Sequence, residues 1–143
     1  MNLGLFSCLF MMKRNDHYFE SIEDLSGLSK NHPLLSLSLL VILFSLAGIP
    51  PLAGFFAKFY VFKSVIEQSM YFLAIVGLLS TVIAAFYYLR IIKIIYFDEA
   101  KEKYDLDHSI WLKLSLTMST FLILLYFIFP GKLVEVVSRI NII

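Results

Sequence analysis

Long hydrophobic runs alternate with two polar stretches along this chain. The polar stretches cover residues 13–33 and 98–109, and the apolar runs cover 34–68, 71–97 and 110–130. A transmembrane helix needs about 20 predominantly apolar residues, so each of these runs is long enough to cross a bilayer. We therefore predict an all-α fold, namely a polytopic transmembrane helical bundle with three full spans.

The first run is too long for one straight span. A continuous helix over residues 34–68 would reach about 52 Å, whereas the hydrocarbon core is roughly 30 Å thick. The middle of the run holds a helix-breaking group, Gly48, Ile49, Pro50 and Pro51, with Gly54 just beyond it. We predict a discontinuous span of two half-helices, 34–47 and 53–67, which meet near mid-membrane. A simple kink is the alternative, since proline in membrane helices is often structural.

The N-terminal residues 1–12 are apolar but too short to span a bilayer. We expect them to be the tail of a preceding span, so that the chain is one part of a longer membrane domain. An interfacial anchor is the alternative, although the segment lacks the polar face that such a helix needs. We expect the chain 1–143 to form a single membrane domain.

Composition and charge support a membrane protein. Hydrophobic residues make up 59% of the chain and the mean hydropathy is +0.82, whereas soluble domains are about 45–50% apolar. The formal net charge of +1 gives no indication of a nucleic-acid partner. The single cysteine, Cys8, excludes an internal disulfide and any multi-cysteine metal or iron–sulfur site. Eight basic residues lie in the two polar loops and their flanks, and three lie on the opposite side of the predicted spans. This excess predicts that both loops are cytoplasmic.

Lys58 is the main candidate for chemistry, because it lies within the apolar run eight residues past Pro50. A charge at the centre of a membrane helix costs about 2.5–3.5 kcal/mol on insertion scales, so intramembrane lysines are functional candidates by default. Desolvation and the N-terminal dipole of a half-helix starting near Gly54 both disfavour the ammonium. Such a lysine can exchange protons. The alternative is that Lys58 snorkels to the interface near Lys63.

Other polar residues are weaker candidates for a proton relay. Ser38 and Ser45 lie on the first half-helix and could hold water molecules that lead to the break, although such serines often bond back to their own helix. His32 lies at the membrane entrance, where it could relay protons or simply be a solvated loop histidine. The histidines have no second ligand at helical spacing, so we expect no metal site.

Three segments resemble one known family. They are Ser45–Tyr60 (SLAGIPPLAGFFAKFY), Leu28–Pro33 (LSKNHP) and Ala85–Arg90 (AFYYLR). Together they resemble the antiporter-like membrane subunits of proton-pumping NADH-quinone oxidoreductase (respiratory complex I), with the subunit N branch fitting best. The resemblance implies a larger helical bundle with two inverted repeats, each holding one broken helix. This chain would be its C-terminal fragment and would contain the second broken helix.

The resemblance also implies a function. Lys58 matches the lysine that the family places at the break, as a proton-transfer station in the outer half-channel. NADH, FMN, iron–sulfur clusters and quinone would bind other subunits, leaving no cofactor in this chain. The expected partners are other complex I membrane subunits, the N-terminal part of the same subunit, and the lipid bilayer of a bacterial or mitochondrial inner membrane. The alternatives are a component of a cation/proton antiporter or a nonfunctional truncated remnant.

Overall fold

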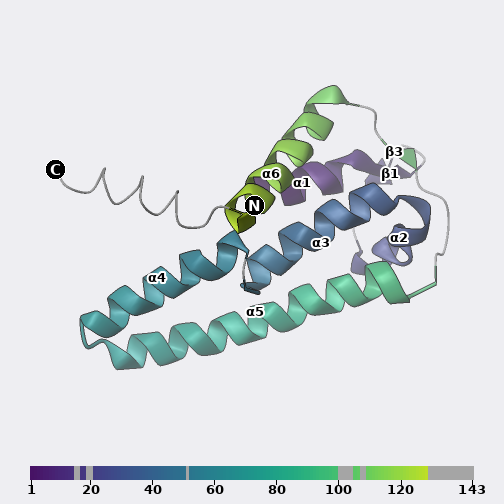
Figure 1. Cartoon of the computed structure of the whole chain (residues 1–143). Coiled ribbons are helices and arrows are strands. Elements are labelled where there is room, and N and C mark those ends of the chain that lie inside the picture. The colour runs from purple at the N-terminus through teal and green to yellow at the C-terminus, as the bar shows by residue number, and fades with distance from the viewer. Residues whose placement is uncertain (15–16, 19–20, 51, 100–104, 107–108, 129–143) are drawn as a thin grey trace.

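The computed structural model describes residues 1–14, 17–18, 21–50, 52–99, 105–106 and 109–128 (Figure 1). The helices are α1 (Asn2–Met11), the 3-10 helix η1 (Ile22–Leu25), α2 (Leu28–Asn31), α3 (Pro33–Ala47), α4 (Ala53–Glu67), α5 (Tyr71–Phe97) and α6 (Ile110–Ile128). The strands are β1 (Met12–Arg14), β2 (His17–Tyr18) and β3 (Asp105–Leu106). The predicted all-helical fold is confirmed, because the long elements are helices and the strands are short pieces of the polar loops.

The two polar loops meet in a small antiparallel sheet. Its strand order is β2-β1-β3, so the first loop pairs with itself and with the second loop. We did not predict this sheet, because strands of two or three residues carry no hydrophobic period. The predicted cytoplasmic loops lie partly outside the described residues, namely at 15–16, 19–20, 100–104 and 107–108.

The helix boundaries follow the apolar runs. α5 has the bounds of the predicted second span, and α3 and α4 match the two predicted half-helices to within a residue. α6 reaches residue 128 of the predicted span 110–130, and the last two residues lie outside the described part. Among the described residues, α5 is the one helix long and apolar enough to cross a membrane by length and composition, with a mean hydropathy of 2.2. α1, α3 and α6 are shorter apolar helices.

α3 lies at the centre of the packing and contacts α1, α4, α5 and α6 (Figure 1). Its buried side chains, Leu39, Ile42 and Leu43, belong to the same hydrophobic core as Ile92 and Ile95 of α5. The N-terminal half of α5 extends past α3 and runs alongside α4, with most of its large apolar side chains exposed. This arrangement buries one face of α3, with α5 in contact with both α3 and α4.

α1 and α6 pack closely because small residues face each other. A Cβ added to Gly4 would lie 2.7 Å from Cβ of Ser119, so the two backbones approach where both side chains are small. Close approach over small residues is typical of helix pairs in membranes. The hydroxyl oxygens of Ser7 and Ser115 lie 2.9 Å apart and link the same two helices by a hydrogen bond.

Candidate functional site

The C-terminal end of α3 closes in a regular helix-ending motif. Gly48 adopts a left-handed conformation, with φ of 85° and ψ of 34°, which glycine reaches without steric cost. The Gly48 amide donates to the carbonyl oxygen of Ser45, and the Ile49 amide donates to that of Phe44, both at 3.1 Å. This is the Schellman pattern. It satisfies two of the last carbonyls of α3 and leaves those of Leu46 and Ala47.

The double proline removes the donors that these two carbonyls would otherwise have. In a continuing α-helix the amide of residue 50 bonds the carbonyl of residue 46, and the amide of residue 51 bonds that of residue 47. Proline has no amide hydrogen. The placement of Pro51 lies outside the described residues, but its lack of a donor follows from its chemistry. The sequence therefore deprives Leu46 and Ala47 of their helical partners.

The side chain of Lys58 supplies the replacement donors. Its Nζ atom lies 3.0 Å from the carbonyl oxygen of Leu46 and 3.1 Å from that of Ala47, and it donates to both. Lys58 is in the second turn of α4 and is half-buried. Its amine therefore sits at the C-terminal end of α3, where the helix dipole favours a positive charge.

This geometry argues against one interpretation of Lys58, namely that its side chain snorkels to the interface. A snorkelling lysine would extend toward Lys63, at the far end of α4. The amine instead bonds the carbonyls at the break. Lys63 forms an exposed ion pair with Glu67, with Nζ and Oε1 3.8 Å apart. The sequence predicts the effect of the α4 dipole but does not reveal the stabilising carbonyl end of α3. Counting four residues back from each proline identifies the carbonyls that lack a helical donor, but not the side chain that replaces it.

A second hydrogen bond joins the half-helices in the opposite direction. The Gly54 amide, in the first turn of α4, donates to Oγ of Ser45 at 3.1 Å in a buried position. First-turn amides have no helical acceptor, and Leu52, the residue before α4, makes no side-chain cap. Ser45 of α3 therefore caps α4, while Lys58 of α4 caps α3. We call these contacts the reciprocal caps.

The two glycines of the predicted break give the reciprocal caps their space. A Cβ on Gly54 would overlap the carbonyl oxygen of Ser45. A Cβ on Gly48 would lie 3.1 Å from Cδ and 3.2 Å from Nζ of Lys58. Between them, the carbonyl of Ile49 accepts the Leu52 amide at 3.1 Å and turns the chain toward α4.

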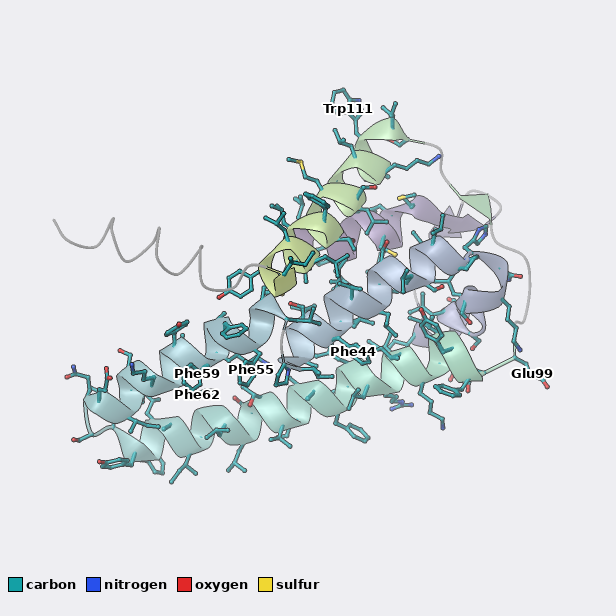
Figure 2. All side chains as sticks on the ribbon, in the orientation of Figure 1. Phe44, Phe55, Phe59, Phe62, Glu99 and Trp111 are labelled. Atoms are coloured by element: carbon teal, nitrogen blue, oxygen red, sulfur yellow. The ribbon has the colours of Figure 1, made fainter. Side chains whose placement is uncertain are left out.

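Aromatic side chains surround this junction. Figure 2 shows Phe44 on α3 and Phe55 on α4 near the place where the two helices meet, with Phe59 and Phe62 farther along α4. The rings of Phe55 and Phe59 stack with centroids 6.1 Å apart.

The predicted relay residues are only partly brought together. Ser45 lies at the break, as described, and its hydroxyl donates to Sδ of Met1 at 3.0 Å. Ser38 donates to the carbonyl of Leu34 in its own helix at 3.0 Å. His32 precedes the first residue of α3. Thirteen residues of helix separate it from Ser45, a distance of about 20 Å. The structure does not bring His32 or Ser38 to Lys58.

The described residues offer no metal site, since they contain no group of three His, Cys, Asp or Glu side chains that could hold an ion. The one cysteine, Cys8 of α1, is buried in the hydrophobic core.

A sequence model described as "NADH:quinone oxidoreductase/Mrp antiporter, TM" matches residues 1–84, which is more than half of the chain. The chain belongs to this family. The antiporter family is a transmembrane one, so membership places the chain in a membrane. The match covers α1, α3, α4 and the first half of α5, and it contains all residues of the reciprocal caps.

Individual members of this family are similar to the chain over almost its whole length. "NADH-quinone oxidoreductase subunit N" of Pelagibacter ubique is 82% identical over 143 residues, which is 100% of this chain and 30% of that relative. The subunits N of Parvibaculum lavamentivorans and Rhodospirillum rubrum are 47% and 45% identical, over 94% of this chain and 28% of each relative. The chain thus spans less than a third of the length of the curated relatives it matches.

A solved structure shows the same arrangement of helices. A chain of the respiratory complex I from Thermus thermophilus, solved with bound aureothin, superposes with a TM-score of 0.75 at 28% identity. The match covers 90% of this chain and 30% of that one. The fold of this chain therefore matches part of a complex I membrane subunit.

Proposed function

We propose that this chain contributes a proton-transfer station, Lys58, to the membrane arm of a proton-pumping NADH-quinone oxidoreductase. The observation that carries the proposal is the position of the Lys58 amine, bonded to two carbonyls at a break in an apolar span. Ionisable residues inside membranes mark ion pathways, and broken helices line the cavities through which ions pass. The similarity to subunits N supplies the reaction in which such a station would serve.

The station would act by simple proton exchange. The ammonium of Lys58 gives a proton to a water molecule in the outer half-channel, and the neutral amine later accepts a proton from the cytoplasmic side. A nearby charge in the assembled protein would favour one form or the other. Electrostatic coupling of this kind needs no cofactor at the site. By the resemblance to complex I, NADH, FMN, iron–sulfur clusters and quinone would bind other subunits.

The same proposal predicts which partners surround the chain in the membrane. The exposed apolar side chains of α5 would face lipid or other membrane subunits of complex I, including the rest of the subunit N bundle. The chain would cross a bacterial inner membrane several times, with both polar loops on the cytoplasmic side. It would have no nucleic-acid partner.

The test is proton translocation by the whole complex. Membrane vesicles that contain the complex with Lys58→Ala are supplied with NADH, and acidification of the lumen is followed with a pH-sensitive dye. We expect a smaller pH gradient than in the matched variant Lys63→Ala, which removes an exposed lysine from the same helix. Equal gradients in the two variants would refute the role of Lys58.

The family description also names an antiporter, which favours the second candidate, a component of a cation/proton antiporter. In that case, proton movement would follow an imposed sodium gradient and would not require NADH. Dependence on NADH with no response to sodium supports the first function. The third possibility, a nonfunctional remnant, predicts that the polypeptide is absent from the purified complex.

A further inference from the structure

We propose that Lys58 exchanges its proton while its nitrogen stays fixed at the break, because two of its three N–H groups hold the half-helices together and the third exchanges. The inference rests on the proposed proton-transfer role and specifies how that role is compatible with the fold. It makes Lys58 both the proton carrier and the residue that positions it.

The number of hydrogens on the nitrogen allows both tasks. A lysine ammonium has three donors and no acceptor. Two donors bond the carbonyls of Leu46 and Ala47, and among the described residues the amine makes no other hydrogen bond. When the third N–H passes its proton to water, the products are a neutral amine and a hydronium ion. The amine keeps two N–H groups and gains a lone pair where the proton was.

The bonds to α3 need not break in this step. Both remaining N–H groups can continue to bond Leu46 and Ala47, although the bonds weaken when the charge is lost. The backbone offers no helical substitute, because residues 50 and 51 are prolines. An unsatisfied carbonyl in an apolar medium is strongly disfavoured. The two carbonyls therefore retain the amine in either protonation state.

The second of the reciprocal caps does not titrate. The bond from the Gly54 amide to Ser45 Oγ involves neutral groups in a buried position, so it holds α4 against α3 whatever the charge of Lys58. The stem of Lys58 passes close to Gly48, since a Cβ added there would lie 3.1 Å from Cδ of the lysine. The junction is thus fixed at two points, and only one of them changes charge.

The two tasks of Lys58 can be separated by substitution. Arginine keeps several N–H donors but does not lose its proton in proteins. Glutamine keeps two donors and carries no exchangeable charge. Methionine has a similar unbranched chain and has no donor. The tether requires a donor, whereas proton transfer requires an amine.

The first experiment measures both properties in the purified complex. Lys58→Arg and Lys58→Gln are expected to keep a thermal stability close to wild type, whereas Lys58→Met lowers it. All three lower NADH-driven proton translocation, and Lys63→Met, the control, changes neither property. The tether is refuted if Lys58→Met is as stable as Lys58→Arg. The proton-transfer role is refuted if Lys58→Arg pumps as wild type does, so the two failures are distinguishable.

A second experiment follows the tether directly. Spin labels are placed at Leu37 of α3 and Val61 of α4, two positions exposed by 53% and 60%. The distance between the labels is measured by pulsed electron resonance at neutral and at alkaline pH. We expect an unchanged distance distribution in wild type and a broadened one in Lys58→Met. A distribution in wild type that shifts toward that of Lys58→Met at alkaline pH would overturn the inference.

Discussion

The amide of Gly54 donates to the hydroxyl of Ser45 across the break, so a side chain of α3 caps the first turn of α4. An N-cap usually comes from the residue just before its helix. Here it comes from Ser45, nine residues before Gly54, because the end of α3 and the start of α4 meet at the break. The caps of both half-helices therefore depend on each other.

The cap predicts a cost for removing the Ser45 hydroxyl. Ser45→Ala is expected to lower the free energy of unfolding by about 1 kcal/mol, the typical value for an N-cap. This change in the free energy of unfolding is measured by unfolding the protein in mixed micelles with an increasing fraction of denaturing detergent. Ser38→Ala is the control, since that hydroxyl bonds only Leu34 of its own helix, and its effect should stay within about 0.5 kcal/mol. Equal losses in both variants would contradict the cap.

Gly54 is expected to tolerate no side chain. A Cβ there would overlap the Ser45 carbonyl, and backbone moves less easily than a side chain. Gly54→Ala should destabilise the protein by about 1–3 kcal/mol or more, as overpacking does. Gly77→Ala is the matched control in α5: its Cβ would lie 2.9 Å from the ring of Phe62, which can turn aside. A cost for Gly77→Ala as large as that for Gly54→Ala would argue against the close approach.

Two substitutions of Gly48 distinguish the effect of backbone strain from that of crowding the Lys58 side chain. Alanine at this left-handed position should cost about 1–2 kcal/mol in stability, while asparagine, which adopts that conformation more readily, should cost less. Both bring a Cβ to about 3 Å from the Lys58 stem and should lower proton translocation. Full translocation in either variant would show that the amine is not confined there.

The hydrogen bond between Ser7 and Ser115 predicts a coupling between α1 and α6. A double-mutant cycle with alanine at both positions should give a coupling free energy of about 0.6 kcal/mol, the average for such bonds in membrane proteins. The cycle Ser7→Ala with Thr120→Ala is the control, because Thr120 bonds Leu116 in its own helix. A coupling of equal size in the control cycle would count against the interhelical bond.

Much of the fold could be predicted from the sequence, because apolar length and proline are local signals. The apolar run 71–97 predicted α5, and the two prolines predicted the break between α3 and α4. The site could be predicted less completely. Lys58 was identified from its unusual charge, but its bonds to the carbonyls of Leu46 and Ala47 depend on how α4 is placed beyond the end of α3, which no local pattern encodes.

Ser45 illustrates the same limit. Its sequence position suggested a relay that holds water, and its neighbours suggested a bond to its own helix. The structure instead places its hydroxyl against the amide of Gly54, nine residues later in the chain. Such a contact is determined by the direction of the turn at Gly48, so it requires the three-dimensional arrangement.

The most direct test of the account is the number of protons translocated per NADH oxidised by the complex that carries Lys58→Arg. Arginine keeps the donors that bond Leu46 and Ala47 but cannot release a proton. We predict a ratio clearly below that of the control variant Lys63→Arg, in a complex that assembles normally. A ratio equal to that of the control would show that Lys58 does not carry the proton.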